Sequence, residues 1–143
     1  MKIVKYVIFV CLFGMLQPYA QAGQTKLDIT LQGKGTVGDK QEMEQIYVEG
    51  TAKGGITGTF IWEEEHQPAF EVGKDVEKGT ITITDQNGDR LVLSFSGRAK
   101  IIDAEESDLE GAEGGFTYLE GTGHWAGKRV EGTYSMAGVF QGD

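Results

Sequence analysis

The sequence predicts an all-β protein, a small closed antiparallel β-barrel of about eight strands (calycin-like), following an N-terminal signal peptide. Apolar and polar residues alternate in short runs separated by turn-forming residues, a pattern typical of sandwiches and barrels. The segment after residue 22 holds 21 of the chain's 22 glycines, about twice the usual frequency. Because glycine inside a strand allows bulges and sharp bends, this composition favours the strongly coiled strands of a small barrel.

The N-terminus has the layout of a secretory signal peptide. Lys2 and Lys5 give it a positive start, an apolar run covers residues 6–16, and the small-residue site Ala20-Gln21-Ala22 follows. The apolar run is shorter than the roughly 20 residues that a membrane-spanning helix needs. We therefore expect cleavage after Ala22 and a secreted or periplasmic protein.

Removal of the signal peptide, residues 1–22, leaves residues 23–143 as a single β-barrel domain. The chain's one cysteine, Cys11, leaves with the signal peptide, so the domain folds without a disulfide. The number of basic residues falls from 13 to 11, against 22 acidic residues. This negative charge argues against nucleic acid and anionic lipid as partners, because both require a basic footprint, and no membrane insertion is expected.

Period-two alternation and turn residues define the expected strands. Leu27, Ile29 and Leu31, for example, alternate with polar residues, as in a half-buried strand. In chain order, the expected strands are 27–32, 43–51, 56–62, a short edge strand at 69–72, 80–84, 90–102, 116–119, 125–126 and 132–140.

Four stretches are expected to interrupt these strands. Gly33-Lys34-Gly35 and Gly38-Asp39-Lys40 break the first strand, 63–68 reads as a solvated break, and 103–115 reads as an acidic loop. A hairpin is expected at 85–89, where Asn87-Gly88 fits the positive φ angles of a type I′ turn.

Three segments carry a resemblance to a known family. They are NGDRLVLSFSG at 87–97, GFTYLEGTGHWAG at 115–127 and GTY at 132–134. This pattern resembles bacterial exported members of the allene oxide cyclase and dirigent-like β-barrel family, over roughly residues 79–140. Glu120 stands where the family has the first of two paired glycines, and Trp125 replaces a phenylalanine. The resemblance implies an eight-stranded antiparallel barrel with a central cavity, and it assigns no catalytic residue here.

No catalytic, metal or cofactor site is expected from the polar residues. The two histidines, His66 and His124, fall short of the three or four ligands of a zinc site, and no cysteine remains to complete one. The serines lack a Gly-x-Ser-x-Gly elbow, and no helix follows the glycine-rich run as a dinucleotide site requires. The acidic runs 63–65 and 103–113 are interpreted as solvated surface, since the second lacks the spacing of a calcium-binding EF-hand.

The aromatic residues in strands are the better candidates for a binding site. An eight-stranded barrel has room inside for packed side chains or for one small ligand, so these residues either fill the core or line a cavity. Polar positions considered for the interior are Tyr47, Glu49, Thr57 and Tyr134. The cavity candidates are Tyr47, Phe60, Trp62, Phe95, Tyr118, Trp125 and Tyr134.

Three classes of function follow from these observations. The first is an exported, non-catalytic barrel that binds a small apolar molecule or a surface partner. The second is a cyclase or isomerase of the kind that the resemblance implies. The third is a small outer-membrane barrel, which the short strands disfavour because each strand must carry an apolar band. The sequence leaves the oligomeric state and the ligand open.

Overall fold

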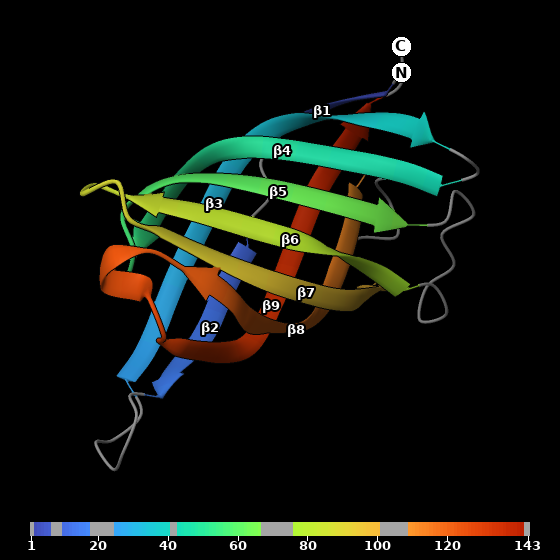
Figure 1. Ribbon diagram of the computed structural model, residues 1–143. Coiled ribbons are helices and arrows are strands. Elements are labelled where there is room, and N and C mark those ends of the chain that lie inside the picture. The colour runs from blue at the N-terminus through green and yellow to red at the C-terminus, as the bar shows by residue number, and fades with distance from the viewer. Residues whose placement is uncertain are drawn as a thin grey trace.

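The computed structural model describes residues 2–6, 10–17, 25–40, 43–66, 76–100 and 109–141, and these residues form an all-β structure (Figure 1). They contain one turn of 3-10 helix and no α-helix, so the predicted all-β class is confirmed. Within this part of the chain, no helix is long and apolar enough to cross a membrane. The elements are β1 (Lys2–Tyr6), β2 (Val10–Gln17), β3 (Thr25–Lys40), β4 (Met43–Gly54), β5 (Gly58–His66), β6 (Val76–Asp85), β7 (Arg90–Lys100), β8 (Leu109–Gly121), η1 (Gly123–Trp125) and β9 (Arg129–Gln141).

Strands β3 to β9 form a curled antiparallel sheet of simple up-and-down topology. Each of these seven strands pairs with its neighbour in the chain, in the order β9-β8-β7-β6-β5-β4-β3. The sheet bends so strongly that β4 to β7 cross over β3 and β9 in the view of Figure 1. Short connections and sequential pairing explain why the chain needs no helical crossover.

β1 and β2, which belong to the expected signal peptide at residues 1–22, lie between β3 and β9. β1 pairs with residues 35–37 of β3 and with residues 139–141 of β9. β2 pairs with residues 25–31 of β3 and with residues 129–135 of β9. All four pairings are antiparallel, so β1 and β2 run in the same direction along one position of the sheet.

β3 and β5 continue through stretches that the sequence predicted to be breaks. β3 continues through the glycines at 33–38 and stays paired with β4 from Ile29 opposite Gly54 to Lys40 opposite Met43, so the predicted break is wrong. The glycines bend this strand without ending it. β5 continues to His66, so residues 63–66 are strand and not a solvated break. Alternation along β5 turns the side chain of Glu64 to the interior.

The C-terminal third differs from the prediction at two points. β8 begins at Leu109, so the second half of the predicted acidic loop is strand. Trp125, expected in a strand, lies in η1, where Gly123 has a φ of +53°. The first half of the acidic loop and the edge strand expected at 69–72 lie outside the described residues.

The concave side of the sheet holds the hydrophobic core. Alternating residues of every strand from β3 to β9 contribute to it, as period-two patterning requires. Of the polar candidates, Tyr134 is buried, whereas Tyr47, Glu49 and Thr57 are exposed. The core contains Ile29, Leu31, Ile46, Val48, Ala52, Ile56, Phe60, Trp62, Ile81, Ile83, Leu91, Leu93, Phe95, Ala112, Phe116, Trp125, Val130, Tyr134 and Met136.

The predicted hairpin joins β6 to β7, with a different turn from the one expected. The Gly88 amide donates to the Asp85 carbonyl at 3.0 Å, and the Asp85 amide donates to the Asp89 carbonyl at 2.9 Å. These bonds enclose a three-residue loop that ends in Gly88, whose φ is +84°. A turn followed by a left-handed glycine is the second common hairpin type, and it replaces the expected type I′ turn.

Asp85 connects this hairpin to the turn between β8 and β9. Its Oδ1 accepts hydrogen bonds from the Asn87 and Asp89 amides, and its Oδ2 accepts one from Trp125 Nε1 at 2.9 Å. The Trp125 bond and then the two amide bonds hold the pKa of Asp85 below its usual value. The buried indole of Trp125 is thereby fixed over one end of the core.

Replacement of Gly88 by valine is expected to destabilise the protein by about 1–3 kcal/mol, because a β-branched residue is strained at this positive φ. No atom lies within 4 Å of a Cβ built at Gly88, so the effect is conformational and not steric. The Gly88→Asn variant is the matched control and should lose less, since asparagine tolerates the left-handed region. Urea denaturation measures both, and equal stability of the valine variant and the parent would contradict the assigned turn.

Candidate functional site

Three aromatic rings meet in the interior of the sheet. The ring centroid of Trp62 lies 4.0 Å from that of Phe95 and 5.5 Å from that of Tyr134. The Phe95 and Tyr134 centroids are 5.4 Å apart, in an edge-to-face arrangement. Such contacts add to the free energy gained from apolar burial, and they fix the positions of the polar atoms on Trp62 and Tyr134.

Two carboxyl groups are buried beside these rings. Glu64 is 3% exposed and Glu77 is 1% exposed. The Tyr134 hydroxyl donates to Glu77 Oε1 at 2.6 Å, and Trp62 Nε1 donates to Glu64 Oε1 at 3.1 Å. The carboxyls of Glu77 and Glu64 are also hydrogen-bonded to each other. The interior of this apolar sheet therefore contains a connected polar network.

Burial and the neighbouring Glu64 charge together keep Glu77 protonated. Desolvation, followed by the charge and hydrogen bond of Glu64, raises the pKa of Glu77 to about 9, against the opposing effect of the Tyr134 hydrogen bond. A protonated Glu77 can donate its proton to the Glu64 carboxylate while it accepts from Tyr134. Desolvation and then the Glu77 carboxyl raise the pKa of the Tyr134 phenol as well.

Strand geometry explains how this network forms. Phe60, Trp62 and Glu64 are spaced by two along β5, so their side chains share the inner face. Tyr134 reaches Glu77 across the position of Gly97, where a Cβ would collide with the Tyr134 hydroxyl. The glycine that follows Ser96 thus makes room for the phenol.

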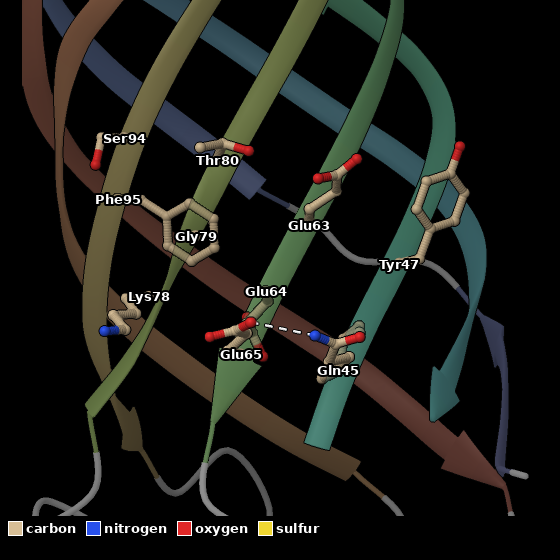
Figure 2. Close-up of a pocket in the computed structure, with 11 residues that line it drawn as sticks. Gln45, Tyr47, Glu63, Glu64, Glu65, Lys78, Gly79, Thr80, Ser94 and Phe95 are labelled. Carbon is tan, nitrogen blue, oxygen red and sulfur yellow. Dashed lines mark hydrogen bonds between the residues drawn. The ribbon is translucent and has the colours of Figure 1, made fainter. Parts of the chain in front are cut away.

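A hollow of about 450 Å³ lies over the outer face of β4 to β7, opposite the interior network. Figure 2 shows its lining residues, which come from four adjacent strands. Two outward-facing rows of side chains border it, one formed by Tyr47, Glu63, Thr80 and Ser94 and the other by Gln45, Glu65 and Lys78. The inward-facing row between them, formed by Ile46, Glu64, Gly79 and Phe95, underlies it. The lining residues are Gln45, Ile46, Tyr47, Glu63, Glu64, Glu65, Lys78, Gly79, Thr80, Ser94 and Phe95.

The floor of the hollow is partly aromatic. Gly79 lies opposite Phe95 in the β6–β7 register and opposite Glu64 in the β5–β6 register. Because Gly79 has no side chain, only its backbone lies between the hollow and the Phe95 ring, which Figure 2 draws beside it. Glu64 and Phe95 therefore belong both to the interior network and to the lining of the hollow.

The border of the hollow is polar and mainly acidic. Glu63, Glu65 and Lys78 are exposed on it, and Gln45 Nε2 donates to Glu65 Oε1 at 3.1 Å. The Tyr47 hydroxyl donates to Glu49 Oε2 at 3.2 Å. Desolvation, followed by this hydrogen bond and the nearby carboxylates, raises the pKa of Tyr47. Donors and acceptors thus surround a floor that contains Ile46 and Phe95 beside the Glu64 carboxyl.

The structure divides the seven candidate aromatic residues among three places. Phe60, Trp62, Phe95 and Tyr134 are buried in the interior, and Phe95 also reaches the hollow. Tyr47 is 39% exposed and borders the hollow from outside.

The other two candidates lie near the turn between β8 and β9. Trp125 is buried there, and Tyr118 is half-buried, with its hydroxyl accepting a hydrogen bond from the Gly127 amide. The seven aromatic residues therefore do not form one common cavity wall.

Sequence analysis missed both buried carboxyls. Glu64 was included in a solvated acidic run, although the alternation of Phe60 and Trp62 extends to it. Glu77 has the same signal, because it precedes Gly79, Ile81 and Ile83 at intervals of two. The charge of these residues predicts an exposed position, since glutamate is rarely buried, whereas the period of two predicts the buried position that the structure shows.

The described residues contain no group of three or more His, Cys, Asp or Glu side chains arranged to hold a metal ion. Comparisons with protein-family models, with curated proteins and with solved structures find no match for this chain. The resemblance to allene oxide cyclase and dirigent-like barrels therefore rests on the sequence pattern.

The interior network predicts an unusual dependence of stability on pH. Glu77 keeps its proton in the folded protein up to about pH 9, whereas in the unfolded chain it releases the proton near 4.5. Between these values the folded state binds more protons, so the free energy of unfolding falls as pH rises, by at most about 1.4 kcal/mol per pH unit from this group. Urea denaturation between pH 7 and 9 measures this slope.

The Glu77→Gln variant should lose this contribution, because glutamine stays neutral and can still accept from Tyr134. Glu120→Gln, on the exposed face of β8, is the control and should retain the parent slope. Identical slopes for the parent and for Glu77→Gln would contradict the assignment.

Proposed function

We propose that this protein is an exported, non-catalytic β-barrel that binds a small, partly apolar molecule in the hollow over β4 to β7. The observation that carries the proposal is the combination of a hollow of about 450 Å³, a floor that includes Ile46 and Phe95, and a polar border. Ligand pockets are commonly about 300–1,000 Å³ and combine apolar walls with a few polar groups that orient the ligand.

The four strands under the hollow support binding through their rigidity. β4 to β7 are paired with each other along most of their length, and their inner faces pack in the core. The backbone of such a sheet is held in place before a ligand arrives, which lowers the entropic cost of binding. Tyr47, Thr80 and Ser94 supply hydroxyl groups at this border for a ligand's polar end.

Export and a closed barrel belong to the same proposal. The positive start, apolar run and small-residue site of residues 1–22 favour a signal peptide that is removed after Ala22. The resemblance to allene oxide cyclase and dirigent-like proteins implies eight barrel strands. Seven of these correspond to β3 to β9, and the strand position between β3 and β9, which β1 and β2 occupy here, corresponds to the eighth. The exported protein therefore closes as a barrel only when another strand fills this position.

A cyclase or isomerase is the second candidate, and the Glu77–Tyr134 pair is the observation that favours it. A carboxylic acid that stays protonated at neutral pH is suited to general acid catalysis. Glu77 is almost fully buried, so a substrate would have to enter the interior to reach it. Binding at the hollow needs no such rearrangement and is therefore the preferred function.

Nuclear magnetic resonance of the exported protein tests the proposal with fatty acids, terpenoids and phenolics as probes. A ligand in the hollow is expected to shift the backbone amides of Glu63–Glu65 and Lys78–Thr80. The Ser94→Trp variant should weaken binding about tenfold, because the added ring would displace roughly 60 Å² of apolar contact at 25 cal/mol per Å². Thr133→Trp, on the exposed face of β9, is the matched control.

Three results would decide against this site. The absence of any amide shift with the whole panel would refute small-molecule binding at the hollow. An equal loss of affinity in Ser94→Trp and Thr133→Trp would place the ligand elsewhere. Turnover of a cyclic or epoxide substrate, abolished by Glu77→Gln, would favour the enzyme.

A further inference from the structure

The strand position between β3 and β9 is filled by β1 and β2. β2 pairs with β3 from Val10 opposite Leu31 to Leu16 opposite Thr25, and with β9 from Cys11 opposite Ser135 to Gln17 opposite Arg129. β1 continues the same position against residues 35–37 and 139–141. The partners of β3 are β1, β2 and β4, and those of β9 are β1, β2 and β8.

Removal of residues 1–22 would leave both of these strand edges without a partner. Each edge would lose seven consecutive paired positions to β2 and three to β1. Unpaired backbone N–H and C=O groups in such a row attract another strand. Two facing edges, one strand position apart, form a stronger acceptor than one edge, because an inserted strand pairs on both sides.

We propose that the processed protein is a strand acceptor, in which an extended segment of another polypeptide inserts between β3 and β9, antiparallel to both. This proposal rests on the signal-peptide part of the proposed function and is independent of the ligand in the hollow. The occupant would take the place that β1 and β2 take in this structure, so its backbone pairing is defined by the same registers.

The side chains that flank the position define the chemistry of the occupant. On the inner face, Ile29 and Leu31 of β3 and Val130 and Tyr134 of β9 are buried. On the outer face, the neighbouring side chains are polar and largely exposed, as at Thr133. The inserted strand should therefore alternate apolar and polar residues over eight or more positions, with its apolar side chains completing the core.

Hydrogen exchange of the protein exported from cells expressing the full chain tests this proposal. Mass spectrometry first establishes whether residues 1–22 are absent. The probe is a synthetic peptide of residues 2–17 with Cys11→Ser and a terminal lysine tag for solubility. We expect the peptide to slow amide exchange at least tenfold in both 25–31 and 129–135, because paired amides exchange only after local opening.

The same peptide with Gly14→Pro is the control and should protect neither strand, since proline removes a backbone donor and blocks the ladder. Four results would overturn the proposal: retention of residues 1–22, slow exchange in both strands before peptide is added, protection of one strand alone, or protection of both edges by dimerisation. Ligand shifts in β4 to β7 report separately on the hollow, so failure of one proposal leaves the other measurable.

Discussion

The antiparallel register of β3 to β9 is the constraint on which the other features depend. Side chains alternate between the two faces of a strand, so pairing decides which residues become neighbours on each face. One row across the sheet joins Ile46, Glu64, Gly79 and Phe95 through three successive registers. This row contributes to the core, contains one of the buried carboxyls and underlies the hollow. A slip of one residue in any of these pairings would separate all three features.

Burial of two carboxyl groups opposes the stability that the core provides. An isolated buried charge is too costly to persist, so a group in this position either pairs or becomes neutral. Here Glu77 becomes neutral, while Glu64 accepts a hydrogen bond from Trp62. In the described residues, no buried side-chain nitrogen or oxygen lacks a hydrogen-bond partner. The network therefore persists because its donors and acceptors are matched, at the expense of an apolar core that would be less sensitive to pH.

The sequence predicts the local pattern of this fold better than its distant contacts. Alternation at Leu27–Leu31 and the Asn87-Gly88 signal correctly locate a strand and a hairpin, because both depend on neighbouring residues. The extent of β3 could not be predicted, since whether a glycine ends a strand depends on its partner in β4. The Tyr134–Glu77 bond joins residues 57 apart and requires Gly97 between them, so no local rule reveals it.

The wall formed by β5 to β7 connects the two sides of the molecule energetically. Glu64 borders the hollow and also raises the pKa of Glu77 through its charge. A ligand that changes the field at Glu64 must therefore change the proton affinity of Glu77. By linkage, the protonation of Glu77 must change the affinity for that ligand by the same factor.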